Sequence, residues 1–291
     1  MNSEADMKPV SSSRARKLGV ALALWVVVVA PAALRAAGND AYDEHEEQLA
    51  LPNRSLHLKC AKPKTPSSPT FLIIFASGDG GMGGGNNKAI YKHMAEQGHY
   101  VAAFSSREAL KQAKNSGRFV TFLELETDIA ALMREAKRLL DLPESTPTVV
   151  TGVSRGASIV VFAAGAPSLL PNICGAVAIA LTRESDEVAP PVLADRGVAI
   201  KLDKKGRILL YPALDRLGSI PIAVIQSTHD HYVSSAESRR LMGPDTPSRR
   251  LYEVEARNHR FDSAQDQMLR DVDEALNWIA AAIDTLRAPA K

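Results

Sequence analysis

Cysteine is scarce in this chain of 291 residues, which contains only Cys60 and Cys174. Two cysteines can form at most one disulfide, and they would pair only in an oxidising compartment. Cys174 lies in an apolar stretch, where a cysteine often serves as a small buried residue. The sequence leaves the pairing of Cys60 with Cys174 open. With 45% hydrophobic residues, the chain can instead build one large core.

The chain also lacks an excess of charge of either sign. Its 35 Lys and Arg residues nearly balance its 33 Asp and Glu residues. Residues 1–36 hold five of the basic and two of the acidic residues, which leaves 30 basic and 31 acidic residues and a net charge of −1 in the remainder. Such a balance offers no electrostatic footprint for a nucleic acid. We therefore expect no nucleic-acid partner.

The N-terminus carries the features of an export signal. Four basic residues (Lys8, Arg14, Arg16 and Lys17) precede an uncharged stretch over residues 18–34, which is followed by small residues around Ala36 and Ala37. A retained membrane anchor is the alternative, although the stretch is near the lower limit of about 17 residues for a spanning helix and contains Pro31. We predict a signal peptide (or N-terminal membrane anchor) over residues 1–37. In either case the rest of the chain is expected in the periplasm.

Strand and helix patterns alternate along the rest of the chain. We interpret residues 38–69 as a lead-in segment with one short strand and residues 70–288 as a single domain, since no internal repeat or second boundary is present. We expect strands near residues 71–76, 100–104, 148–153, 176–181, 220–226 and 251–254, and helices near residues 86–97, 122–140, 155–164, 236–242 and 268–283. This alternation indicates an α/β fold with a mostly parallel sheet and helices on both faces, in which ligands bind at the carboxyl ends of the strands. The least regular stretch, residues 184–205, is expected to form a cap or loop that shapes the substrate site.

Residues 152–156 read Gly-Val-Ser-Arg-Gly, a G-x-S-x-G pentapeptide that directly follows an apolar run. A strand that ends in this motif can enter a tight turn that projects the serine hydroxyl above the sheet edge, because small residues flank the serine. The helix that follows would supply backbone N–H groups and a positive dipole end. Ser154 is therefore a candidate nucleophile. Taken alone, it would more often be a helix N-cap.

A serine hydroxyl needs a base to take its proton, and the base needs an acid that holds it in one tautomer. His259 and Asp230 each follow a predicted strand, which places both at the same sheet edge as Ser154. Taken singly, Asp230 fits a turn and His259 fits an exposed loop. Two alternative acids, Asp186 and Asp262, follow no clear strand. The chain order Ser154, Asp230, His259 is that of the α/β-hydrolase fold, which we predict for this chain.

A glycine-rich run at residues 77–85 follows the first strand of the predicted domain. Small residues there let backbone N–H groups face a developing oxyanion. We expect the N–H of Asp79 or Gly80, together with that of Arg155, to form an oxyanion hole. The glycine spacing also matches a dinucleotide-binding loop, but the predicted helix begins only after the run, and an exported chain has little access to a nicotinamide. We therefore predict no cofactor.

His229 and His231 flank Asp230 and could face the same side of an extended segment, where two imidazoles can share a zinc ion. No third ligand is evident in the sequence. We therefore predict no metal site.

The glycine run, the pentapeptide and the segments around Asp230 and His259 resemble those of the VirJ-like family of exported bacterial virulence proteins of the α/β-hydrolase type. The most distinctive match is Ser-Gly-Asp-Gly-Gly at residues 77–81, and the resemblance covers roughly residues 70–280. It implies a periplasmic serine hydrolase. Some relatives are thought to cleave aminoacylated phospholipid (lysyl-phosphatidylglycerol) or to assist a type IV secretion system. Met82 and Arg155 depart from the family pattern, which expects aromatic residues there, and they bear on the choice of substrate.

These features favour an exported serine hydrolase that cleaves a carboxylic ester, with a small molecule or a lipid as substrate, through an acyl-enzyme on Ser154. The alternative is a non-catalytic adaptor of the same fold for envelope or type IV secretion proteins. Contact with a membrane surface fits either function. The Arg155 side chain suggests, as a further hypothesis, an acidic or phosphate-bearing substrate.

Overall fold

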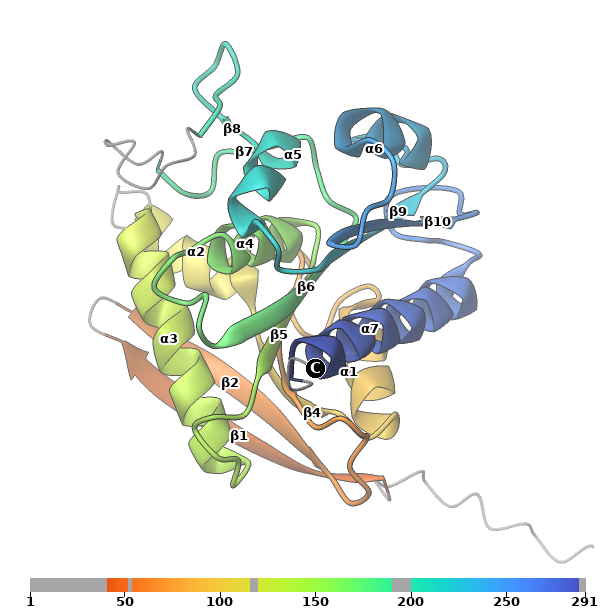
Figure 1. Cartoon of the computed structure of the whole chain (residues 1–291). Helices are drawn as coiled ribbons and strands as arrows, with labels where there is room; N and C mark the ends of the chain where they lie inside the picture. Colours follow the sequence, from red (N-terminus) through yellow and green to blue (C-terminus); the bar gives the residue numbers. More distant parts are fainter. Residues whose placement is uncertain (1–40, 52–53, 116–119, 190–199, 288–291) are drawn as a thin grey trace, which may run out of the picture. The chain divides into compact units, whose positions relative to one another are not determined.

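A sheet of eight strands forms the centre of the fold, in the order β1-β2-β4-β3-β5-β6-β9-β10 (Figure 1). All neighbours from β4 to β10 in this order run parallel. These strands are β3 (Leu72–Ala76), β4 (Tyr100–Phe104), β5 (Thr148–Val153), β6 (Ile173–Ile179), β9 (Ile222–Ser227) and β10 (Arg249–Val254). Each lies within a few residues of its expected range. The prediction of a mostly parallel sheet is confirmed.

The computed structural model describes residues 41–51, 54–115, 120–189 and 200–287. The signal peptide or anchor predicted for residues 1–37 lies outside these ranges. The described residues belong to one compact unit that spans residues 39–291. No helix within them has both the length and the apolar character needed to cross a membrane.

Two antiparallel strands, β1 (Tyr42–Leu51) and β2 (Arg54–Pro63), extend the sheet beyond β4. The prediction of one short strand within residues 38–69 is therefore wrong, because this segment holds two strands of ten residues each. β1 is the outer strand, and the residues from Asp43 to Gln48 are all exposed. Its sequence consequently lacks the alternation of apolar and polar residues by which a half-buried strand is recognised.

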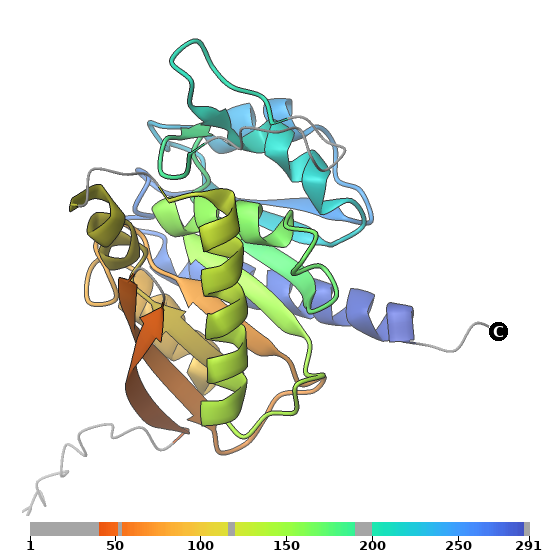
Figure 2. The same cartoon turned by 90° about the vertical axis from the view of Figure 1, so that its left-hand side faces the viewer.

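Each face of the sheet carries its own hydrophobic core, because alternate residues of a strand point to opposite faces. In β3, for example, Leu72 belongs to one core and Ile73 to the other. One core is covered by α3 (Phe122–Leu139) and α4 (Arg155–Ala164), and the other by α1 (Asn87–Glu96) and α7 (Gln265–Arg287) (Figure 1, Figure 2). The prediction of helices on both faces is confirmed.

The remaining elements are mostly short. They are α2 (Ser106–Asn115), β7 (Glu184–Ser185), β8 (Ile208–Leu209), α5 (Leu210–Ala213), the 3-10 helix η1 (Leu214–Leu217) and α6 (Ser235–Met242). Of these, only α6 was expected from the sequence. β7 and β8 pair as a second, two-stranded sheet within and just after the stretch predicted as a cap or loop. Strands of two residues are too short to show a period of two.

Cys60 and Cys174 are not joined by a disulfide. Cys60 lies in β2 and Cys174 in β6, and the three strands β4, β3 and β5 lie between them in the sheet. Neighbouring strands are about 4.8 Å apart, whereas a disulfide requires Cα atoms within about 7 Å. The two cysteines therefore cannot form a bond in this fold. Burial raises the pKa of the Cys60 thiol to about 12, which keeps it protonated and unreactive.

Candidate active site

Ser154 occupies the turn between β5 and α4. Its backbone has φ 52° and ψ −112°, a conformation that is uncommon for a residue with a side chain. A Cβ at Gly152 would collide with the backbone of Gly156, and a Cβ at Gly156 would collide with the carbonyl oxygen of Ala76 in β3. Both glycines of the pentapeptide are therefore required by close backbone approach, which lets α4 pack directly against the sheet.

The hydroxyl of Ser154 faces an imidazole. Ser154 holds the N-cap position of α4, but its side chain makes no capping hydrogen bond. Instead, its Oγ lies 2.9 Å from Nε2 of His259. Nδ1 of His259 lies 2.6 Å from Oδ2 of Asp230. The structure thus brings the three predicted residues together in one hydrogen-bonded chain, with His259 between a hydroxyl and a carboxylate.

Asp230 is held by several donors. Its side chain has no exposed surface. Its Oδ1 accepts hydrogen bonds from the backbone N–H groups of Tyr232, at 2.8 Å, and Val233, at 3.5 Å. Its Oδ2 faces His259 and also accepts a hydrogen bond from Nε2 of Gln226 at 2.8 Å. The sequence reasoning missed Gln226, although a polar residue in a strand that is otherwise almost entirely apolar was a usable signal.

His259 stands in the loop between β10 and α7, and Asn258 shapes that loop. Oδ1 of Asn258 accepts hydrogen bonds from the backbone N–H groups of Arg260 and Asp262. Its Nδ2 donates to the carboxylate of Asp262 at 2.7 Å. Asp262, one of the two alternative acids, is thus engaged within the loop. The other side of His259 meets the ring of Tyr232 edge-on, with the ring centres 4.8 Å apart.

The glycine-rich loop lies beside Ser154. A Cβ at Gly78 would come within 3.6 Å of the Cβ of Ser154. Asn87 holds the loop in place: its Oδ1 accepts a hydrogen bond from the N–H of Gly78 at 3.0 Å, and its Nδ2 donates to the carbonyls of Gly81 and Gly84. α1 begins at Asn87. The prediction that this helix starts only after the glycine run is confirmed.

The backbone N–H groups of Asp79, Gly80 and Arg155 have no hydrogen-bond partner among the residues that the structure describes. All three can therefore bind an oxygen atom of a ligand. Asp79 and Arg155 line the same cavity as Ser154, whereas Gly80 does not. This favours Asp79 over Gly80 as the donor from the glycine-rich loop.

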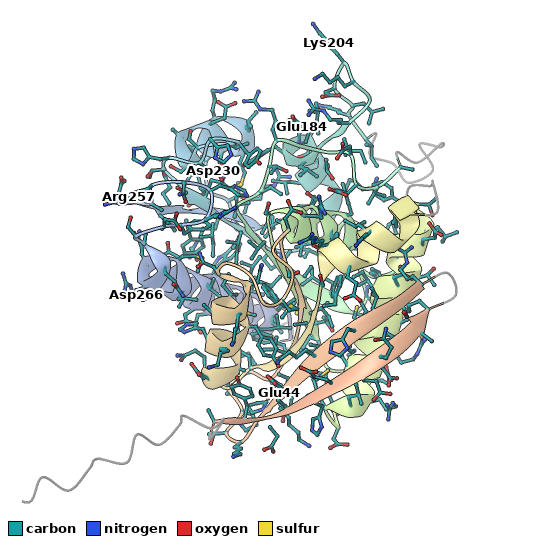
Figure 3. The ribbon with its side chains drawn as sticks, turned by 180° about the vertical axis from the view of Figure 1, so that it is seen from behind. Glu44, Glu184, Lys204, Asp230, Arg257 and Asp266 are labelled. Carbon is teal, nitrogen blue, oxygen red and sulfur yellow. The ribbon has the colours of Figure 1, made fainter. Side chains whose placement is uncertain are left out.

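The cavity in front of Ser154 has a volume of about 670 Å³ and a strongly charged lining. Its carboxylates are those of Asp79, Glu184, Asp186, Glu187 and Asp203, and its guanidinium groups are those of Arg155, Arg183 and Arg207. Asp203 and Arg207 belong to the loop before β8, which projects away from the sheet with Lys204 at its tip (Figure 3). Acidic groups outnumber basic ones by five to three. The lining therefore carries an excess of two negative charges when all these groups are ionised.

Arg155 lies between two of these carboxylates. Its Nε is 2.9 Å from Oδ1 of Asp79 and 2.7 Å from Oε1 of Glu187. Burial raises the pKa of the Glu187 carboxyl, and the positive charge of Arg155 opposes that shift. The two carboxylates offset the charge of Arg155, which disfavours the acidic or phosphate-bearing substrate suggested by the sequence.

The two histidines beside Asp230 do not share a ligand site. Nδ1 of His229 lies 3.0 Å from the carbonyl oxygen of Ala256, whereas the ring of His231 packs against Tyr232. In the described part of the chain, no three His, Cys, Asp or Glu side chains are grouped closely enough to hold a metal ion.

Comparison with solved structures identifies the fold. Est1E from Butyrivibrio proteoclasticus is 17% identical, with a TM-score of 0.55 over 81% of this chain and 99% of its own. A Klebsiella pneumoniae protein described as a dienelactone hydrolase is 14% identical, with a TM-score of 0.59 over 83% of this chain and 99% of its own. The acylaminoacyl peptidase of Pyrococcus horikoshii is 14% identical, with a TM-score of 0.57 over 82% of this chain and 41% of its own. No family model and no curated protein matches the sequence. The chain has the α/β-hydrolase fold, and its resemblance to the VirJ-like family stays a prediction.

Proposed function

We propose that this chain is an exported serine hydrolase that cleaves a carboxylic ester through an acyl-enzyme on Ser154. The hydrogen-bonded chain from Ser154 through His259 to Asp230, called the triad below, carries the proposal. Neighbours of the same fold include proteins described as a hydrolase and a peptidase. The proposal assigns this chain the same general chemistry, the transfer of an acyl group to water.

The triad performs the reaction in two halves. Nε2 of His259 accepts the proton of the Ser154 hydroxyl as Oγ attacks the ester carbonyl, and it then donates that proton to the departing alkoxide. Water attacks the acyl-enzyme with His259 again as the base, which releases the carboxylic acid and regenerates Ser154. Asp230 keeps the proton of the neutral imidazole on Nδ1 and stabilises the imidazolium that forms in each half.

The tetrahedral intermediate carries a negative oxygen that needs hydrogen-bond donors. We assign this role to the N–H of Arg155 and to that of Asp79 or Gly80, because these N–H groups have no hydrogen-bond partner among the described residues. Of the three residues, Arg155 and Asp79 line the cavity in front of Ser154. A donor of this kind contributes about 3–4 kcal/mol to the stabilisation of the transition state. The side chain of Arg155 takes no part in this step.

An aminoacylated phospholipid is the proposed substrate. The negative lining of the cavity favours an ester that carries a positive charge, and an α-amino group on the acyl part supplies one. The resemblance to the VirJ-like family points to the same substrate class. This substrate also fits export to the periplasm and contact with a membrane surface, and secretion proteins remain possible partners.

An active-site fluorophosphonate probe tests the reaction class. Purified protein without residues 1–37 should be labelled, whereas the Ser154→Ala variant should not. Ser158→Ala is a matched control, since Ser158 lies one turn further along α4 and lines the same cavity. Equal labelling of the Ser154→Ala variant, or no labelling of the wild type, would contradict the proposal. Full function of Ser154→Ala in cells would favour the adaptor instead.

Lipid analysis of cells tests the substrate. One ester lipid should accumulate in a deletion strain and also in a strain that carries Ser154→Ala, but not in one that carries Ser158→Ala. An unchanged lipid profile would exclude a lipid substrate. Fusion of residues 1–37 to a reporter that is active only outside the cytoplasm tests export, and an inactive reporter would contradict it.

A further inference from the structure

Gln226 is a buried amide next to the triad. It lies in β9 and has no exposed surface. Its Nε2 donates to Oδ2 of Asp230 at 2.8 Å and to the carbonyl oxygen of Val233 at 2.5 Å. Both partners are acceptors, so the reversed amide would place oxygen against oxygen. The orientation of the Gln226 amide is therefore determined by its surroundings.

The other half of this amide is unsatisfied. Oε1 of Gln226 is buried and has no hydrogen-bond partner among the described residues. A buried acceptor without a donor reduces the stability of the folded state. Its neighbours in β9, Val224 and Ile225, are apolar and equally buried. The amide thus leaves one acceptor unsatisfied while it donates to two others, one of which is the carboxylate of the triad.

We propose that Gln226 is a positioning residue for the acid of the triad. The inference rests on the proposed function, since it concerns the same site. Backbone N–H groups fix Oδ1 of Asp230, but Oδ2 has only His259 and Gln226 as partners among the described residues. The amide of Gln226 holds Oδ2 in line with Nδ1 of His259. It also donates a hydrogen bond to the carboxylate of Asp230 while positive charge develops on the imidazole.

Other titratable groups near Asp230 come from neighbouring elements. Tyr211 of α5 is buried, its hydroxyl lies 2.6 Å from Oγ of Ser238, and burial raises its pKa. The ring of His231 lies 5.9 Å from that of His259, centre to centre. Neither residue has a hydrogen bond to Gln226 among the described residues, and both are unaltered in a Gln226 variant. A change in the pH profile of a Gln226 variant therefore reports on Gln226 and its effect on Asp230.

Gln226→Met tests the inference, because methionine keeps the length of the side chain but neither donates to Asp230 nor buries an amide oxygen. The kcat for ester hydrolysis should fall about tenfold, the size expected for one hydrogen bond to a charged group, with little change in KM. Methionine also removes the donor to the Val233 carbonyl, so the melting temperature is recorded and kcat is measured per folded molecule. A purely structural role predicts a lower melting temperature with kcat per folded molecule unchanged, and that result would contradict the inference.

Gln226→Glu supplies a second signature, since two carboxyl groups at this distance share one proton. The kcat of the Gln226→Glu variant should fall as rising pH removes the shared proton, over a pH range in which the kcat of the wild type stays constant or rises. Ser227→Ala is the matched control: Ser227 is equally buried, and its hydroxyl donates to the carbonyl of Ala256. Wild-type kcat and pH profile in both Gln226 variants would overturn the inference. No labelling of the wild type by the fluorophosphonate probe would instead contradict the proposed function.

Discussion

The Nε atom of Arg155 lies 2.7 Å from Oε1 of Glu187. This contact ties the first residue of α4, which follows Ser154, to the segment that begins with β7 and forms one wall of the cavity. Arg155 also meets Asp79 of the glycine-rich loop. Three segments that are far apart in the sequence are thus joined at one guanidinium beside Ser154.

Replacement of Arg155 by alanine should change substrate preference and not the reaction itself. The N–H assigned to the oxyanion hole belongs to the backbone and remains, so the fluorophosphonate probe should still label Ser154. Loss of the guanidinium leaves the lining more negative, and kcat/KM for a cationic ester should rise relative to that for a neutral ester of the same size. Steady-state kinetics with the two esters measure this ratio. An unchanged ratio would show that Arg155 does not influence the charge seen by the substrate.

Asp230→Asn should lower kcat by roughly 10³- to 10⁴-fold, because the amide no longer stabilises the imidazolium of His259. Asp262→Asn is the control, since Asp262 was an alternative acid and is instead bound by Asn258. Its activity should stay close to that of the wild type, because the asparagine oxygen can still accept the hydrogen bond from Nδ2 of Asn258. Comparable losses in the two variants would contradict the assignment of Asp230. Kinetics with a chromogenic ester provide the measurement.

Gly156→Ala should destabilise the fold strongly. The new Cβ would overlap the carbonyl oxygen of Ala76, which belongs to the backbone of β3 and cannot move freely. We expect a loss of about 3 kcal/mol or more in the free energy of unfolding, measured by urea denaturation. Gly83→Ala is the control, because a Cβ at Gly83 meets nothing within 4 Å. A Gly156→Ala variant as stable as Gly83→Ala would show that α4 can shift away from the sheet.

Asp271→Asn should stabilise the protein at neutral and alkaline pH. Burial and the nearby Glu274 raise the pKa of Asp271 from 3.8 to about 6. The folded state therefore binds this proton more tightly than the unfolded state does, so stability is lost as pH rises from about 4 through about 6. The variant removes that loss, which we put at about 1 kcal/mol after allowance for solvent screening. Urea denaturation should show the gain at pH 8 and its decline towards pH 4, and a gain independent of pH would contradict this origin.

Much of the site could be predicted because its signals are local. The G-x-S-x-G turn depends on close backbone contacts that only glycine allows, and such a requirement is visible in the sequence itself. Asp230 and His259 were identified because each follows a strand, and in a parallel sheet the carboxyl ends of all strands lie at one edge. The order of the strands was not needed for this inference.

Other features depend on contacts between distant segments, which no local sequence pattern reveals. The lack of a hydrogen-bond partner for Oε1 of Gln226 among the described residues becomes apparent only when the loop after β9 is placed. The ion pair of Arg155 with Glu187 likewise depends on the position of the segment after β7. β1 was missed for a different reason. Between its buried end residues, Tyr42 and Leu51, this strand is almost entirely exposed and has no apolar face. Its hydrogen bonds to β2 define it, and its side chains do not.

The acidity of β1 bears on self-association. An outer strand offers unpaired backbone groups to any second strand, and proteins commonly protect such edges with charge. β1 exposes Asp43, Glu44, Glu46 and Glu47 along its length. Antiparallel pairing of β1 from two copies would bring these carboxylates together, and like charges directly opposite one another destabilise a sheet. The same exposed carboxylates that remove the apolar–polar alternation from β1 therefore also protect the protein from fibrous aggregation through this edge.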